Sequence, residues 1–277
     1  MTSAPTSPLI AAAELVELLD RGEVTVLDVR YRTSGPSGRR QYDAGHVPGA
    51  AYVDLDAALA APPGPGGRHP LPDPEVFGAA MRRAGVSGSH PVVVYDDWSG
   101  HAAGRAWWLL RHHGHPDVRV LDGGWAAWRE AGGAAQASTP RVAEGDFEPG
   151  PGVLPVVEAD AVLDVPVLVD ARAPERYRGD TEPIDPVAGR IPGALNVPTS
   201  TNLGSDGRFR DPAQLRALYE AAGVPLDGTE VAVYCGSGVT AIHDVLALEL
   251  LGVRATLYPG SWSGWITDPS RPVEVGR

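Results

Sequence analysis

The chain has 277 residues, a length typical of about two domains, and its 43% hydrophobic and 21% charged residues are those of a globular protein. A formal net charge of −12 argues against general binding of nucleic acids. The sequence contains no lysine, so Schiff-base chemistry is excluded, and any positive charge offered to a substrate must come from the 23 arginines.

The single cysteine, Cys235, excludes an internal disulfide and argues against a cysteine-rich metal site. No apolar run reaches the roughly 20 residues that span a membrane. The N-terminal segment through Leu15 lacks the basic start of a signal peptide. We therefore expect a protein of the reducing cytoplasm, without a membrane partner, a metal or a cofactor.

The first half of the chain alternates predicted helices and strands. Asp73 and Pro74 mark one helix start, because aspartate is a good N-cap and proline is favoured at the first helical position. The expected elements are, in order, a helix over 9–20, a strand over 24–29, a loop to 42, a turn and strand over 45–56, a loop over 61–67, a helix over 74–83, a strand, loop and helix over 92–114, and a strand with a short helix over 118–133.

The same order of landmarks returns about 140 residues later, which indicates an internal duplication. The matching pairs are 27–30 with 168–172, 45–54 with 189–198, 73–74 with 211–212, 92–96 with 231–235, and 121–128 with 257–265. The alternation predicts an α/β fold of two similar domains, each a mostly parallel sheet flanked by helices. We place these domains at 1–135 and 157–277, joined by a linker over 136–156 that is rich in alanine, glycine and proline. Asp28 and Asp170 end equivalent strands and are expected to hydrogen-bond to loops.

Cys235 lies between an apolar run that predicts a buried strand, residues 231–234, and an apolar-periodic run that predicts a helix, residues 242–251. Backbone N–H groups are unpaired where a helix begins, and Gly236 and Gly238 let several of them converge on one point. Such a loop favours thiolate over thiol and could equally hold a persulfide. A buried apolar cysteine is the alternative, but it would need no such loop.

The two halves differ at this position, since Asp96 matches Cys235. We therefore expect the first half to support the site without repeating its chemistry. Two other thiol chemistries fit less well. A cysteine phosphatase needs an arginine six residues after the nucleophile, where this chain has Ala241. A redox thiol enzyme needs a second, resolving cysteine, and Cys235 is the single cysteine of this sequence.

Taken together, the paired GHVPGA and GRIPGA segments, the Asp96 and Cys235 pair, the WSGW ending and the CGSGVTA loop resemble the tandem-domain rhodanese family of sulfurtransferases. The resemblance covers nearly the whole chain. It implies that Cys235 takes a sulfur atom from a small anionic donor, 3-mercaptopyruvate or thiosulfate. The resulting persulfide is then passed to a thiophilic acceptor such as cyanide or a thiol, in covalent, ping-pong catalysis.

The resemblance also assigns roles to single residues. Arg176 matches the family's substrate-binding arginine, and Arg172 and Arg178, which are close in sequence, are expected to assist it. The alternative for each is a solvated surface residue. Ser237 and His46 match a serine and a histidine that relay a proton, although His46 could equally be a turn histidine bonded to the backbone. The amides that would hold the persulfide belong to the loop residues Gly236, Ser237, Gly238, Val239 and Thr240.

The chain departs from the family pattern in two places. The loop over 181–189 lacks the second carboxylate-binding arginine of mercaptopyruvate enzymes, for which Arg190 is a candidate replacement, and the acid expected upstream of His46 is missing from the loop over 32–40. The Gly236-Ser237 pair favours mercaptopyruvate as the donor, because thiosulfate enzymes carry basic residues there. A thiosulfate-preferring rhodanese and a non-enzymatic persulfide carrier or binding module remain the alternatives.

Overall fold

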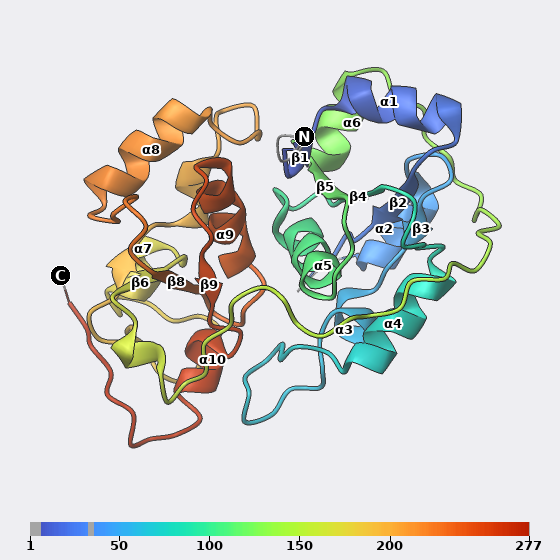
Figure 1. The fold of residues 1–277 in the computed structure, drawn as a ribbon. Coiled ribbons are helices and arrows are strands. Elements are labelled where there is room, and N and C mark those ends of the chain that lie inside the picture. The colour runs from blue at the N-terminus through green and yellow to red at the C-terminus, as the bar shows by residue number, and fades with distance from the viewer. Residues whose placement is uncertain (1–6, 33–35, 277) are drawn as a thin grey trace. The chain divides into compact units, whose positions relative to one another are not determined.

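The computed structural model describes residues 7–32 and 36–276, so residues 1–6 of the segment inspected for a signal peptide lie outside it. The chain divides into two compact units (Figure 1). The first unit takes the described residues up to Leu59 together with Pro72–Val153, and the second takes Ala60–Leu71 and the described residues from Leu154 onward. This grouping differs from the predicted ranges in two places: Ala60–Leu71 belongs with the second unit, and residues 136–153 belong with the first.

The first unit is built on a five-stranded parallel sheet with the order β1-β5-β4-β2-β3. Figure 1 shows α1 and α6 on one side of this sheet and α5 on the other. The elements are β1 (Leu9–Ile10), α1 (Ala12–Arg21), β2 (Thr25–Asp28), α2 (Gly38–Ala44), β3 (Ala51–Tyr52), α3 (Leu55–Ala58), α4 (Pro74–Arg83), β4 (Val92–Tyr95), α5 (His101–His112), β5 (Val118–Leu121) and α6 (Gly124–Glu130).

The second unit repeats this plan on a four-stranded parallel sheet with the order β7-β6-β8-β9, which matches β3-β2-β4-β5 strand for strand. A single parallel bridge from Val156 to Leu257 stands where β1 pairs with β5. The elements are η1 (Val162–Asp164), β6 (Val167–Asp170), α7 (Pro174–Tyr177), β7 (Leu195–Asn196), η2 (Thr199–Asn202), α8 (Pro212–Ala221), β8 (Val231–Tyr234), α9 (Ala241–Leu250), β9 (Thr256–Leu257) and α10 (Ser261–Trp265). The predicted α/β fold of two parallel-sheet domains is confirmed.

Local sequence signals explain several helix boundaries. The carboxylate of Asp73 accepts the N–H groups of Glu75 and Val76 at the start of α4, and the carboxylate of Asp211 accepts the N–H of Gln214 at the start of α8. Gly22 ends α1 in the left-handed conformation, with φ of 66°.

Two elements differ from the sequence prediction. Residues 9–20 do not form one helix, because Leu9 and Ile10 pair with β5 as a short strand before α1 begins. The predicted loop up to residue 42 contains α2, capped by the hydroxyl of Ser37, which accepts the N–H of Arg40 at 3.3 Å. Residues 33–35 of that loop lie outside the described residues. Short apolar and polar runs of this kind carry little periodicity, so pattern alone cannot assign them.

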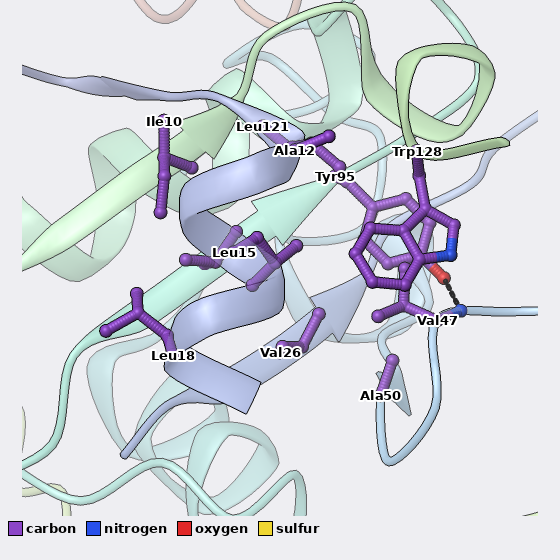
Figure 2. Packing of buried hydrophobic residues seen from close by; sticks show 11 residues of the cluster. Ile10, Ala12, Leu15, Leu18, Val26, Val47, Ala50, Tyr95, Leu121 and Trp128 are labelled. Atoms are coloured by element: carbon purple, nitrogen blue, oxygen red, sulfur yellow. Dashed lines mark hydrogen bonds between the residues drawn. The ribbon is translucent and has the colours of Figure 1, made fainter. Parts of the chain in front are cut away.

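The core of the first unit lies between α1 and the sheet. Figure 2 shows Leu15 and Leu18 on α1 and Val26 on β2, with Tyr95 and Trp128 close together near Val47. The hydroxyl of Tyr95 accepts the backbone N–H of Val47 at 3.1 Å, which ties the turn after α2 to the end of β4. In the second unit Tyr234 does the same for Ile191, so the duplication extends to buried hydrogen bonds.

Candidate active site

Cys235 directly follows β8 and begins the loop that leads into α9, which runs alongside β8 and β9 (Figure 1). Its side chain is a free thiol, and the residue is 1% exposed. The backbone N–H of Gly238 donates to Sγ at 3.2 Å, so the loop does turn an amide onto the sulfur. The backbone of Cys235 is held as well, because its N–H donates to Oγ of Ser261 at 3.0 Å and its carbonyl accepts the N–H of Trp262 at 2.9 Å.

Two residues with left-handed backbone conformations frame the cysteine. Gly238 has φ of 77°, and a Cβ on it would lie 2.3 Å from the carbonyl oxygen of Pro259, so only glycine fits there. Ser261 has φ of 51°, an unfavourable value for a residue with a side chain. Its buried Oγ lies 4.0 Å from Sγ of Cys235. Strain of this kind persists where surrounding contacts hold a residue in place, and it is common in active sites.

Ser237, two residues after the nucleophile, contacts a histidine that the sequence analysis did not single out. Oγ of Ser237 and Nδ1 of His69 are 2.8 Å apart. His69 comes from Ala60–Leu71, the part of the first half that belongs with the second unit. One repeat signal could have drawn attention to this segment, because a Gly-Arg pair precedes both Asp-Pro helix starts, at Gly67-Arg68 and at Gly207-Arg208.

His46, the histidine expected in this role, lies in the core of the first unit. Its Nδ1 is 2.8 Å from the carbonyl oxygen of Tyr42, its ring stacks on the Tyr42 ring with centroids 3.8 Å apart, and it is fully buried. These contacts are those of a turn histidine bonded to the backbone, the alternative given above. A part for His46 in proton transfer stays a prediction, whereas the contact with Ser237 belongs to His69.

Arg176, at the end of α7, belongs to a cluster of charged side chains beside the loop. Its Nε and Nη2 donate to the carboxylate of Glu182 at 3.1 and 2.7 Å, and Nη2 also lies 3.2 Å from Oδ2 of Asp185. The other carboxylate oxygen of Asp185 pairs with Nη1 of Arg68, the neighbour of His69. Burial lowers the pKa of Arg68 from its ordinary value, and the positive charge of Arg176 contributes to that lowering.

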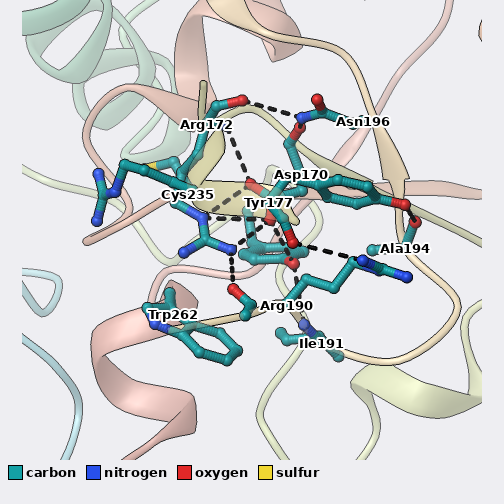
Figure 3. Close-up of polar contacts among 12 residues, drawn as sticks. Asp170, Arg172, Tyr177, Arg190, Ile191, Ala194, Asn196, Cys235 and Trp262 are labelled. Carbon is teal, nitrogen blue, oxygen red and sulfur yellow. Dashed lines mark hydrogen bonds and ion pairs between the residues drawn. The ribbon is translucent and has the colours of Figure 1, made fainter. Parts of the chain in front are cut away.

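Arg172 is held inside the second unit. It is 4% exposed, and its guanidinium donates to the carboxylate of Asp170 and to the carbonyl oxygen of Gly189 (Figure 3). The guanidinium also lies 4.8 Å from the centroid of the Trp262 ring.

The first unit contains the same arrangement around Arg30. Its guanidinium donates to Asp28 and to the carbonyl oxygen of Gly45, and it lies over the Trp125 ring. Because this half lacks the nucleophile, the duplication favours a structural role for Arg172, and donor binding by Arg172 stays a prediction. The expected hydrogen bonding of both strand-end aspartates to loops is confirmed, since Asp28 and Asp170 accept the backbone N–H groups of Arg30 and Arg172.

Arg190, the candidate replacement for the missing arginine, is also occupied elsewhere. Its guanidinium donates to the carbonyl oxygen of Gly276 at 2.6 Å, pairs with the carboxylate of Glu274, and lies 4.3 Å from the centroid of the Tyr177 ring (Figure 3 shows Arg190 and Tyr177). These contacts tie the C-terminal segment to the turn before β7.

The other residues of the 235–240 loop also have defined surroundings. The carbonyl of Gly236 accepts the N–H of Ser263 at 2.9 Å, Val239 is buried, and Thr240 is the residue before α9. Their amides as ligands of a persulfide stay a prediction. Among the residues that the structure describes, no group of three or more His, Cys, Asp or Glu side chains could hold a metal ion. No helix in this part of the chain has the length and apolar character needed to cross a membrane.

A buried thiol at a strand–loop–helix turn, with a serine–histidine pair and two arginines beside it, defines a site for cysteine-dependent group transfer from an anionic substrate. Comparison with known proteins places this site in a family. Residues 11–131 and 157–268 both match the model of the rhodanese-like domain. The chain therefore belongs to the rhodanese family.

Its relatives match over nearly their full length. The chain is 46% identical to SseB of Mycobacterium tuberculosis, named as a thiosulfate sulfurtransferase, over 97% of both chains. It is also 46% identical to a Pseudomonas aeruginosa protein named as a 3-mercaptopyruvate sulfurtransferase, over 98% of this chain and 99% of that one. Among solved structures, SseA of Escherichia coli, a 3-mercaptopyruvate sulfurtransferase, superposes with a TM-score of 0.82 at 34% identity, over 93% of this chain and 100% of that one.

Proposed function

We propose that this sulfurtransferase takes the thiol sulfur of 3-mercaptopyruvate, holds it as the sulfane sulfur of a Cys235 persulfide, and passes it to a thiophilic acceptor. The observation that carries the proposal is the environment of the Cys235 sulfur. The backbone N–H of Gly238 donates to it, and Ser237, two residues after Cys235, contacts His69. An amide donor on sulfur stabilises a thiolate before the reaction and the charge of a persulfide after it.

The first half-reaction breaks the carbon–sulfur bond of the donor. The Cys235 thiolate attacks the donor sulfur, a sulfur–sulfur bond forms, and the electron pair of the broken bond leaves with the pyruvate enolate. The enolate must then take up a proton to become pyruvate. We assign delivery of that proton to Ser237 and His69, because a histidine 2.8 Å from a hydroxyl can pass a proton through it.

The second half-reaction returns the enzyme to its starting state. A thiolate or cyanide attacks the outer sulfur of the persulfide, and the electron pair of the sulfur–sulfur bond returns to Cys235 as the thiolate. We place this cycle in a reducing cytoplasm, where a lone reactive thiol stays reduced. The net charge of −12 supports small molecules, and not nucleic acids, as the partners.

The two donors differ in the leaving group that they release. Thiosulfate would release sulfite, which carries its own negative charge away and needs no proton, whereas a pyruvate enolate is quenched by one. The Ser237–His69 pair therefore supports mercaptopyruvate as the preferred donor. A thiosulfate-preferring enzyme and a persulfide carrier that acts without turnover are the alternatives.

Mass spectrometry and steady-state kinetics test the proposal together. Treatment with 3-mercaptopyruvate should add about 32 Da, one sulfur atom, to the peptide that contains Cys235, and cyanide should remove it. Cys235→Ser should lose the adduct and at least about a thousandfold of the turnover, because the nucleophile is gone. Unchanged turnover in Cys235→Ser would remove this residue from the mechanism.

The preferred donor is tested by measuring kcat/KM for 3-mercaptopyruvate and thiosulfate side by side. We expect 3-mercaptopyruvate to exceed thiosulfate, and His69→Ala to reduce turnover with mercaptopyruvate more than with thiosulfate. A higher value for thiosulfate would reverse the donor assignment while leaving the persulfide chemistry intact. An adduct that forms but is not passed to cyanide or to added thiols would favour a carrier.

A further inference from the structure

The loop over 181–189 contains no arginine, yet two guanidinium groups lie beside the catalytic loop. A Cβ placed on Gly236 would lie 2.9 Å from Nη2 of Arg68 and 3.5 Å from both Nη1 and Nη2 of Arg176. The two arginines, from segments more than a hundred residues apart, therefore meet next to the residue that follows the nucleophile.

In each guanidinium, at least one nitrogen pairs with a carboxylate, and one terminal nitrogen is left without a hydrogen bond to any residue that the structure describes. Nη1 of Arg68 pairs with Asp185, and Nε and Nη2 of Arg176 pair with Glu182 and Asp185. Within the described residues, Nη2 of Arg68 and Nη1 of Arg176 make no hydrogen bond. Both of these nitrogens are next to Gly236.

The exposure of the four side chains fixes the direction from which an anion would approach. Asp185 and Glu182 are 4% and 3% exposed, whereas Arg68 and Arg176 are 29% and 16% exposed. The carboxylates thus lie behind the guanidiniums. An anion that comes from solvent meets N–H donors first, and the two arginines are kept together by the carboxylate of Asp185 that they share.

We propose that Arg68 supplies the second guanidinium of the donor site, and that the carboxylate of the 2-oxo acid donor binds between Nη2 of Arg68 and Nη1 of Arg176. Asp185 is the positioning residue that holds the two guanidiniums at the spacing of one carboxylate. This inference rests on the proposed function and adds to it the residue that the 181–189 loop lacks. Charge-assisted N–H donors from two arginines give both affinity and a fixed orientation of the donor relative to Cys235.

Donor-concentration dependence tests the proposal in the full-length protein. Arg68→Ala should raise KM for 3-mercaptopyruvate about 10- to 100-fold, the loss expected for one charge-assisted hydrogen bond, with kcat changed much less. Arg68→Lys, which keeps the charge but not the planar fork, should fall between Arg68→Ala and wild type. Arg216→Ala, which removes an exposed arginine paired with Glu220, is the matched control and should behave as wild type.

A donor without a carboxylate separates binding from folding. With mercaptoacetone, which has the same thiol and ketone but no carboxylate, Arg68→Ala and wild type should show the same concentration dependence of persulfide formation. A penalty of equal size with both donors would mean that Arg68 only supports the loop or His69, and would overturn the proposal. Thiosulfate is the third arm: a penalty with thiosulfate but none with mercaptopyruvate would also overturn it.

The role of Asp185 as the positioning residue is tested by Asp185→Ala, which should raise KM for mercaptopyruvate as Arg68→Ala does. The double variant should show little more than either single change, because both act on one contact. Failure of the proposed function is a separate result, since it would appear as the absence of a Cys235 adduct in the wild type at saturating donor. An adduct that forms with identical donor dependence in wild type and Arg68→Ala would overturn only the role of Arg68.

Discussion

The loops after β4 and β8 stand at the same place in the two sheets, and they hold different groups. In the first unit Oδ1 of the buried Asp96 accepts the N–H groups of Trp98 and Gly100 at 2.9 and 2.8 Å, and Oδ2 accepts that of Ala103 at 2.9 Å. In the second unit Sγ of Cys235 accepts the N–H of Gly238 at 3.2 Å. The same strand–loop–helix turn thus directs backbone N–H groups at a carboxylate in one half and at a thiol in the other.

The comparison shows that this turn alone does not make the site. Asp96 accepts three backbone N–H groups, whereas the loop of Cys235 also brings Ser237 into contact with His69 and has the guanidinium groups of Arg68 and Arg176 next to Gly236. The fold supplies the N–H donors, and the segment Ala60–Leu71 supplies Arg68 and His69, the two residues to which we assign donor binding and proton delivery.

The two loops also exchange a glycine and a serine at matched positions. Ser99, with φ of 57°, stands where the second half has Gly238, and Gly124, with φ of 55°, stands where it has Ser261. A Cβ on Gly124 would lie 2.3 Å from the carbonyl oxygen of Asp96. The second half therefore tolerates a strained serine at the position where its Oγ can hold the backbone of the nucleophile.

The largest effect on stability is expected at Asp96. Asp96→Ala removes the acceptor of three N–H groups, two of them in buried hydrogen bonds. Each buried donor left unpaired costs about 1–3 kcal/mol, so the free energy of unfolding of the first unit should fall by several kcal/mol. Urea unfolding measures this. Asp96→Asn keeps one acceptor oxygen and should lose less. An unchanged urea midpoint in Asp96→Ala would show that the carboxylate is not what holds this loop.

Sequence reasoning predicted the parts of the fold and site that depend on neighbours in the chain. The strand, loop and helix around Cys235, the caps at Asp73 and Asp211, and the duplication itself all follow from periodicity and local chemistry. The match of Asp96 to Cys235 correctly placed both residues in equivalent loops. Arg176, which matches a family motif for donor binding, lies next to Gly236.

The parts that depend on distant segments could not be predicted in this way. His69 and Ser237 are 168 residues apart, and the segment around His69 has neither the period of a helix nor that of a strand. The sequence does not show that Arg172 and Arg176 have different surroundings. Only the structure shows that the guanidinium of Arg172 pairs with Asp170, two residues away. A pattern shows which residues are available, whereas the partner of each guanidinium is decided by packing.

A smaller effect is expected at Ser261. Ser261→Gly and Ser261→Ala both remove the Oγ that accepts the N–H of Cys235, so both should slow persulfide formation, by about tenfold for one lost hydrogen bond of about 1.4 kcal/mol. Only glycine relieves the positive φ, so Ser261→Gly should be more stable than Ser261→Ala by roughly 1 kcal/mol. Thermal unfolding compares the two. Equal melting temperatures would mean that the backbone of Ser261 is not strained.

The helices that follow the two loops bury different ionisable side chains, an arginine in α5 and an aspartate in α9, and this difference predicts the smallest effect. In α5 the buried Arg105 donates through Nε to the carbonyl oxygen of Leu59 at 3.0 Å. In α9 the buried Asp244 accepts the side-chain amide of Asn202 at 2.6 Å and lies beside Tyr219. The same amide nitrogen of Asn202 is 3.2 Å from Nδ1 of His243. Burial raises the pKa of the Asp244 carboxyl well above its ordinary value.

A carboxyl that keeps its proton longer in the folded state than in the unfolded state makes stability fall as pH rises. The folded protein binds the extra proton above about pH 4, the ordinary range for aspartate, so the free energy of unfolding declines from there up to the raised pKa. Asp244→Asn cannot titrate and should lack this decline. The difference in urea midpoint between Asp244→Asn and wild type should therefore shift in favour of the variant between pH 5 and pH 8. Asp160→Asn changes an exposed aspartate and should run parallel to wild type. A parallel curve for Asp244→Asn as well would show that Asp244 is ionised in the folded protein, and that α9 buries a charge as α5 does.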